Sequence, residues 1–134
     1  MARPAVLITG AAKRIGAVLA RRFAAAGWHV VIHAGHSPVL ARDLAQTMPS
    51  AEVVEADLLD RAAALAMIDE LAARLPDWRM LINSAAVFKP DTAQGIDPII
   101  FAEAMRVNAE VPTAMAQAYL AKARSTGGRR VIQF

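Results

Sequence analysis

Thr9-Gly10-Ala11-Ala12-Lys13-Arg14-Ile15-Gly16 is a glycine-containing turn between a predicted strand and a predicted helix. It follows an apolar run at residues 5–8 and leads into a segment with helical periodicity. Gly10 lets the chain turn tightly out of a strand, and Gly16 lets the next helix lie close to the sheet. The free N–H groups and positive end of that helix then face any anion at the turn. We interpret the stretch as a phosphate-binding turn, although the glycine spacing alone also fits an ordinary strand-to-helix turn.

Apolar runs typical of buried strands alternate with helical segments along the rest of the chain. We predict strands at residues 5–9, 28–33, 51–56, 78–82 and 131–134, with Asn83 directly after the fourth. This alternation predicts an α/β, Rossmann-like, doubly wound parallel sheet with strand order 3-2-1-4-5, cut off within strand five. The loops after Gly10 and Asn83 then flank one crevice, which is where such sheets bind ligands.

The helical periodicity also predicts which side chains face the sheet. The helices expected at residues 14–26, 38–48, 60–75 and 98–124 place these residues on their inner faces: Ile15, Leu19, Phe23 and Ala26; Leu40, Leu44 and Met48; Leu65, Ile68, Leu71 and Leu75; and Phe101, Met105, Asn108, Pro112, Met115 and Tyr119.

The composition limits the possible functions. The 134 residues fit one domain over residues 1–134, and 56% apolar residues exclude a disordered chain. The absence of cysteine excludes a disulfide scaffold and a thiolate metal cluster, and it agrees with a cytoplasmic protein. A net charge of +3 and a pI near 10.0 would suit nucleic acid, but the basic residues are dispersed among carboxylates without stacking aromatics. We therefore expect a small-molecule partner and neither nucleic acid, a metal ion nor a membrane.

Four motifs follow one another in register over nearly the whole chain. They are Thr9-Gly-x-x-x-x-x-Gly16, Asp57-Leu58, Asn83-x-Ala85 and Asn108-x-x-x-Pro112. In this order and spacing the chain resembles the short-chain dehydrogenase/reductase family. It is most similar to the pteridine reductase branch, in which Arg replaces the middle glycine, as Arg14 does here.

The resemblance implies a cofactor role for each matching position. Gly10, Arg14, Ile15 and Gly16 would surround the pyrophosphate, and Asp57 and Leu58 would contact the adenine. The nicotinamide ribose would be lined by Asn83, Ser84 and Ala85. Ser84 departs from the family pattern, which usually has a second Asn at this position. In the pteridine reductases a ring matching Phe88 stacks on the pterin, with Arg14 near the polar edge of the substrate.

The end of the second strand bears on the choice of cofactor. An NAD enzyme places a carboxylate there to accept a hydrogen bond from the ribose 2′-OH. This chain has His33-Ala34-Gly35-His36-Ser37 and no acid. A 2′-phosphate would instead meet Lys13 or Arg14, His36, Ser37 and Arg42, so we predict NADP(H). We interpret His33 as a solvated loop residue.

Pro112, four residues after Asn108, bears on the shape of the helix expected at residues 98–124. Because Pro112 has no N–H, the carbonyl of Asn108 loses its usual helical partner, and the helix is expected to kink. The resemblance implies that the freed carbonyl holds a water in the proton relay, which makes Asn108 the one catalytic candidate. A simple packing kink is the alternative.

The catalytic Tyr-x-x-x-Lys of the family is missing from the sequence. Tyr119 is the only tyrosine; Lys122 follows at the wrong spacing, and we interpret Tyr119 as a packing residue. We expect the N-terminal portion of an NADPH-dependent reductase of C=N or C=O bonds, such as those of a pterin or dihydrofolate. We expect its full-length form to be a homodimer or homotetramer. The alternative is a dinucleotide-binding chain that catalyses nothing by itself.

Overall fold

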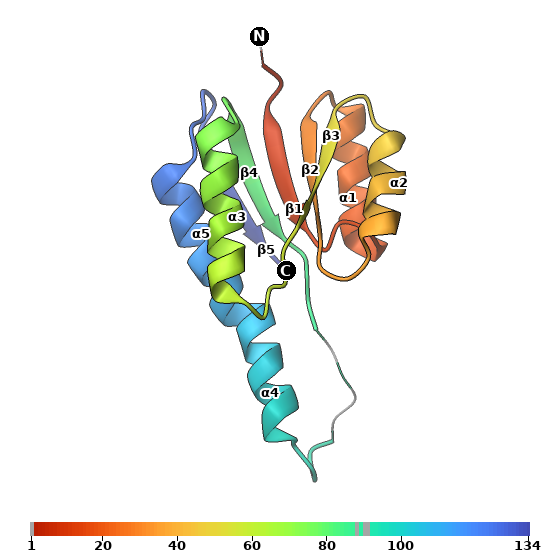
Figure 1. Ribbon diagram of the computed structural model, residues 1–134, viewed down its shortest axis with the longest axis vertical. Coiled ribbons are helices and arrows are strands. Elements are labelled where there is room, and N and C mark those ends of the chain that lie inside the picture. Colours follow the sequence, from red (N-terminus) through yellow and green to blue (C-terminus); the bar gives the residue numbers. More distant parts are fainter. Residues whose placement is uncertain (1, 88, 90–91) are drawn as a thin grey trace.

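The computed structural model describes residues 2–87, 89 and 92–134. Within that part of the chain five strands form one parallel sheet: β1 (Ala5–Thr9), β2 (His29–Ala34), β3 (Ala51–Glu55), β4 (Trp78–Asn83) and β5 (Arg130–Gln133). The strands lie in the order β3-β2-β1-β4-β5, and each neighbouring pair is parallel (Figure 1). This confirms the predicted fold class and strand order.

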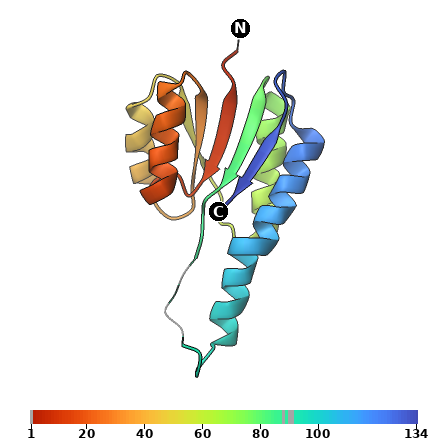
Figure 2. The ribbon, with the colours of Figure 1, turned by 180° about the vertical axis from the view of Figure 1, so that it is seen from behind.

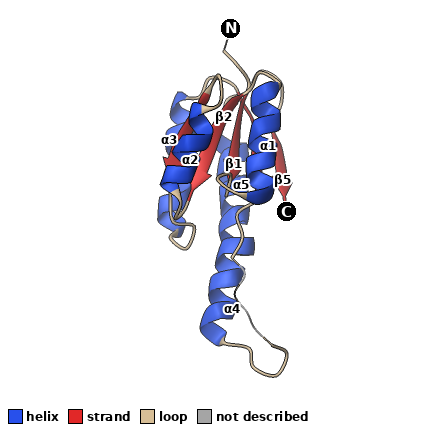
Figure 3. Cartoon of the chain, turned by 90° about the vertical axis from the view of Figure 1, so that its right-hand side faces the viewer, coloured by secondary structure: helices blue, strands red, loops and turns tan. Residues whose placement is uncertain are grey.

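Helices cover both faces of the sheet. One face carries α1 (Arg14–Ala25) and α2 (Pro38–Gln46), and the other carries α3 (Arg61–Arg74) and α5 (Val111–Lys122), as Figures 1 and 2 show from opposite sides. The chain reaches α5 through α4 (Pro98–Met105) and a π-helical segment, η1 (Arg106–Glu110). Figure 3 shows α4 extending past the carboxyl ends of the strands. No helix in the described residues is both long and apolar enough to span a bilayer.

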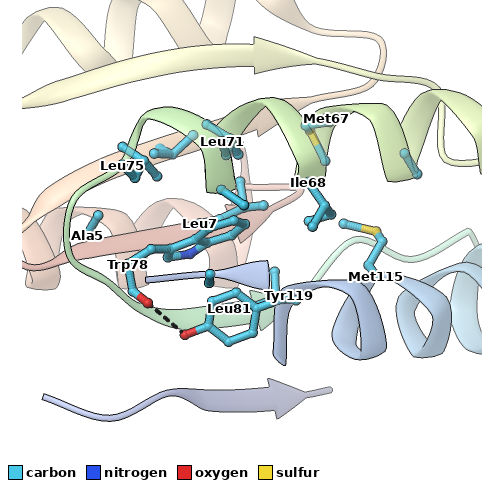
Figure 4. Packing of buried hydrophobic residues seen from close by; sticks show 14 of the residues in the cluster. Ala5, Leu7, Met67, Ile68, Leu71, Leu75, Trp78, Leu81, Met115 and Tyr119 are labelled. Atoms are coloured by element: carbon cyan, nitrogen blue, oxygen red, sulfur yellow. Dashed lines mark hydrogen bonds between the residues drawn. The ribbon is translucent and has the colours of Figure 1, made fainter. Parts of the chain in front are cut away.

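Alternation along the strands divides the core into two layers. In β1, Val6 and Ile8 pack toward α1 and α2, whereas Ala5 and Leu7 pack toward α3 and α5. All four side chains are almost completely buried, which explains why β1 has a continuous apolar sequence rather than an alternating one. Figure 4 shows the layer under α3 and α5, where Leu7 lies near Trp78 and Ile68.

The predicted inner face of the first helix is correct only in part: Leu19 and Phe23 pack against the core, but Ile15 and Ala26 are exposed. Ile15 is 60% exposed and Phe23 is only half-buried, whereas α1 buries its small residues. The sequence contains two plausible helical stripes, one large and one small. The turn before α1 brings the helix so close to the sheet that the small stripe fits: Gly16, Ala17, Ala20 and Ala24.

Two further predicted faces also need correction. Leu40 is 47% exposed, because α2 docks through Ala41 and Leu44. The long helix expected at residues 98–124 is three segments, and its first part lies beyond the sheet. Phe101, Met105 and Asn108 are therefore exposed, and the buried residues begin with Val107 and continue with Val111 and Pro112.

Candidate functional site

The glycine turn after β1 has no room for side chains at its two glycines. Gly10 has a φ of +63°, and a Cβ placed on it would lie 2.9 Å from the Cα of Ala85. A Cβ on Gly16 would lie 2.5 Å from the carbonyl oxygen of Gly10. Arg14 also has a positive φ, 53°, a conformation that costs a side-chain-bearing residue about 1–2 kcal/mol. This position therefore favours glycine, and the arginine is held there at a cost in backbone strain.

Hydrogen bonds join the ends of β1 and β4, the two strands that flank the switch point. The hydroxyl oxygen of Thr9 accepts from the backbone N–H groups of Ser84 and Ala85, at 3.1 Å each. The Ser84 hydroxyl donates in return to the carbonyl of Thr9. Ser84, which departs from the family pattern, is thus already occupied in fixing the two loops.

A cleft of about 530 Å³ opens between these loops at the carboxyl ends of the strands. Its size lies in the range of small-molecule sites. Eleven residues predicted to bind the cofactor line it: Gly10, Lys13, Arg14, Ile15, Gly16, His36, Ser37, Asp57, Leu58, Ser84 and Ala85. The exposed side chain of Ile15 is therefore an apolar surface on the wall of the cleft.

Two other predicted site residues, Asn83 and Asn108, do not line the cleft, and a third is not described. Asn83 is buried behind the cleft, where its amide donates to Gln133 Oε1 at 2.8 Å and to the carbonyl of Pro112 at 3.3 Å. Asn108 is exposed on η1 and does not line the cleft. Phe88 falls outside the described residues.

The charges at the cleft favour an anion. Lys13 and Arg14 stand at the start of α1, where the helix dipole adds positive potential, and neither has a carboxylate partner within the described part of the chain. The carboxylate of the cleft, Asp57, accepts from the backbone N–H of Leu59 at 2.9 Å, which fixes the loop after β3. Arg42 is instead paired with Glu55 at 2.8 Å. Of the basic groups proposed for a 2′-phosphate, Arg42 is thus the one already engaged.

His33 is not the solvated residue that its sequence position suggests. It lies within β2, is 2% exposed, and lines the inner wall of the cleft. Its Nδ1 accepts from the N–H of Gly10 at 3.2 Å, and its Nε2 donates to the carbonyl of Ala56 at 2.8 Å. Burial lowers the pKa of His33 below the ordinary imidazole value. The one available signal was that His33 directly continues the apolar run of β2, where a strand buried on both faces has no solvated position.

Asn108 holds the loop after β4 through its side chain. Its Oδ1 accepts from the N–H of Val87 at 2.8 Å, and its Nδ2 donates to the carbonyl of Val87 at 3.0 Å. The π-helical turn that contains Asn108 closes with the N–H of Val111 on the carbonyl of Arg106, just before Pro112. A π-helical turn therefore directly precedes Pro112, near which the sequence predicts a kink.

Replacing Asn108 with alanine is expected to release Val87 while leaving the fold intact. Two exposed hydrogen bonds are lost, so local opening at Val87 should become easier by about 1–2 kcal/mol. Amide hydrogen exchange at Val87 measures this change. Asn108→Asp is the matched control, since its carboxylate still accepts from Val87 N–H. Equal exchange rates at Val87 in the parent and in Asn108→Ala would contradict the role of the side chain.

Comparison with known proteins identifies one family of dehydrogenases. Residues 4–133 match the family described as short chain dehydrogenase. The probable galactose dehydrogenase GalD of Rhizobium meliloti is 32% identical over 133 residues, which cover 96% of this chain and 52% of that protein. Galactitol 2-dehydrogenase of Agrobacterium fabrum is 30% identical over 125 residues, covering 92% of this chain and 49% of the relative. The chain thus spans about half the length of the curated relatives it matches.

A solved structure resembles the fold closely. The crystal structure of FolM alternative dihydrofolate reductase 1 from Brucella suis, in complex with NADP, superposes with a TM-score of 0.86 at 25% identity. The match covers 96% of this chain and 55% of that protein.

Proposed function

The chain belongs to the short-chain dehydrogenase family, and from that premise we propose that its cleft binds NADP(H) in a reductase that transfers hydride to a C=O or C=N bond. The observation that carries the proposal is the cleft itself. A glycine turn and the start of α1 form one wall, and the loop after β4 forms the other. The nicotinamide cofactor would supply the hydride, while the protein positions it and its substrate.

The glycine turn is proposed to hold the pyrophosphate. Gly10 and Gly16 keep the backbone close to the cleft, and the N-terminal N–H groups of α1 provide donors for an anion. We propose that Asp57 and Leu58 contact the adenine and that Ser84 and Ala85 line the nicotinamide ribose. Asn83 is proposed to act indirectly, by holding the end of β4 against Gln133.

The preference for NADP(H) over NAD(H) rests on the end of β2. No carboxylate follows β2, whereas His36 and Ser37 line the cleft together with Lys13 and Arg14. Such groups suit a 2′-phosphate, and a ribose 2′-OH would lack its usual acidic acceptor. The NADP complex of the FolM enzyme, at 25% identity, supports the same choice.

A pterin or dihydrofolate is the substrate class we propose. Arg14 at the mouth of the cleft supports it, as does the likeness to the FolM dihydrofolate reductase. The relatives named for galactose and galactitol favour a second candidate, a sugar carbonyl. Measuring NADPH oxidation by the full-length protein with dihydropteridines, dihydrofolate and sugar ketones separates the two candidates. If no substrate of either class were turned over, the reductase proposal would be refuted.

The proton donor for this reaction is not Tyr119. That side chain is fully buried and donates to the carbonyl of Trp78 at 3.1 Å, and burial raises its pKa to about 12. We therefore propose that residues 1–134 act as a dinucleotide-binding domain, and that a Tyr and Lys from the rest of the protein complete the site. Asn108 is proposed to support their proton relay through its carbonyl. We place the protein in the cytoplasm as a homodimer or homotetramer, which sedimentation of the full-length protein would test.

Titration of the 134-residue chain with NADPH and NADH, followed by nicotinamide fluorescence, tests the cofactor proposal. We expect binding of both, tighter for NADPH, without turnover. Absence of binding by a folded chain would refute the proposal for residues 1–134.

Replacing Arg14 with glycine and with alanine separates its charge from its backbone strain. Both variants lose the guanidinium, so the affinity for NADPH should fall about tenfold in each if Arg14 holds a phosphate. Glycine also relieves the positive φ, so Arg14→Gly should be more stable than Arg14→Ala by about 1 kcal/mol. Titration and denaturant unfolding measure the two effects independently. Unchanged NADPH affinity in both variants would remove Arg14 from the cofactor site.

A further inference from the structure

His33 is a buried titratable residue that touches two separate loops of the cleft. Its ring accepts from Gly10 on the glycine turn and donates to Ala56, the residue before Asp57. Its own carbonyl also accepts from the N–H of Ala11 at 3.3 Å, so side chain and backbone both hold the turn. We propose that His33 is a positioning residue that sets the glycine turn and the loop after β3 in register, and that it does so as a neutral imidazole protonated only at Nε2.

The partners determine the tautomer. A backbone N–H can only donate, so Nδ1 facing Gly10 carries no proton. A backbone carbonyl can only accept, so Nε2 facing Ala56 carries the proton. Both hydrogen bonds therefore require the same single form of the ring, and the other neutral tautomer satisfies neither.

Protonation would break this arrangement. In the imidazolium both nitrogens donate, and Nδ1–H would face the N–H of Gly10 in a site that is 2% exposed. The groups lining the cleft with His33 are Lys13 and Arg14 at the turn, His36 after β2 and Asp57 after β3. Repulsion by His36 adds to the burial that holds the pKa of His33 below its ordinary value.

Because only the neutral His33 ring fits its partners, its contribution to stability depends on pH. The neutral ring is favoured in the folded protein, so its stabilising effect is complete above the ordinary imidazole pKa, about 6.5. It is lost as the pH falls from there through the lower pKa of the folded state. If the cleft binds NADP(H) as proposed above, the affinity should fall over the same interval, because the turn that receives the pyrophosphate loses its support.

Two near-isosteric substitutions separate the contacts. The Oδ1 of an asparagine can take the place of Nδ1, so His33→Asn keeps an acceptor for Gly10 but does not reach Ala56. The Nε2 of a glutamine can take the place of the ring Nε2, so His33→Gln keeps a donor for Ala56 but leaves Gly10 N–H unpaired. We expect similar unfolding free energies for the two variants, but about tenfold weaker NADPH binding for His33→Gln than for His33→Asn.

Nitrogen NMR of the ligand-free chain supplies a readout that does not depend on binding. We expect the His33 ring to show an unprotonated Nδ1 and a protonated Nε2 at neutral pH. The amide signal of Gly10 should shift strongly in His33→Gln and weakly in His33→Asn. A ring protonated at Nδ1, or equal Gly10 shifts in both variants, would overturn the proposal. Failure of the wild-type chain to bind NADPH would refute the proposed cofactor, while the NMR result would still decide the role of His33.

Discussion

Replacing Gly16 with alanine is expected to weaken dinucleotide binding strongly, because the added methyl group would overlap the backbone of the turn. The Cβ would lie 2.5 Å from the carbonyl oxygen of Gly10 and 2.8 Å from the Cα of Ala11. Both are backbone atoms, which cannot rotate away as a side chain can. Overpacking of this kind costs about 1–3 kcal/mol, which in binding corresponds to about 5- to 150-fold.

Helix propensity predicts the opposite result for the same substitution. Gly16 lies within α1, where alanine is favoured over glycine by up to about 1 kcal/mol. The clash of the added Cβ is expected to outweigh the gain in helix propensity, because a separation of 2.5 Å requires the turn itself to move. Gly95→Ala is the control, because its nearest atom, Thr92 Oγ1, lies at an ordinary contact distance of 3.6 Å. Parent-like NADPH affinity in Gly16→Ala would show that the turn does not depend on this close approach.

The strands and their order could be predicted because each has a simple physical signature. A parallel sheet covered on both faces needs continuous apolar strands, and the run that ends at Thr9 is one. Right-handed crossovers then leave few possible orders for five alternating strands. The same rules place the loops after Gly10 and Asn83 together, so the location of the cleft follows from the sequence without any knowledge of side-chain geometry.

The inner face of α1 could be predicted only in part, because this helix is rich in alanine, whereas the predicted residues Ile68 and Leu71 of α3 are buried. In α1 the large residues and the small ones form two competing stripes, and periodicity prefers the larger, which contains Ile15 and Phe23. The buried stripe is set by how closely the helix approaches the sheet, and that depends on the tertiary contact between Gly16 and Gly10. Exposure of Ile15 is thus a consequence of the turn and leaves an apolar side chain at the cleft.

His33 shows a different limit of sequence reasoning. A histidine at the end of a strand is usually near solvent, and sequence alone does not reveal that the N–H of Gly10 and the carbonyl of Ala56 meet at one ring. These partners are 23 residues away on opposite sides of it in the chain. Whether a backbone N–H or C=O group finds a hydrogen-bond partner far away in the sequence depends on the assembled sheet. Local sequence patterns therefore cannot predict it.

Replacing Trp78 with alanine is expected to destabilise the fold by about 3–5 kcal/mol, a large share of the stability of an ordinary domain. The indole is completely buried between α3 and α5, with its ring centroid 4.7 Å from that of Tyr119 (Figure 4). Its Nε1 also donates to the carbonyl of Met80 at 2.9 Å. The substitution therefore opens a cavity and removes an aromatic pair in the same layer.

Trp28→Ala provides the matched control, since it deletes the same side chain at a half-buried site before β2. Trp28 makes an edge-on contact with Phe23 at a centroid distance of 5.0 Å, outside the layer under α3 and α5. Denaturant unfolding followed by far-UV circular dichroism compares the two variants without relying on tryptophan fluorescence. Equal losses at the two positions would contradict the view that the layer around Trp78 holds the sheet together. A loss confined to Trp78→Ala would show that the layer under α3 and α5, in which Trp78 is buried, contributes more to the stability of the fold than the half-buried site of Trp28.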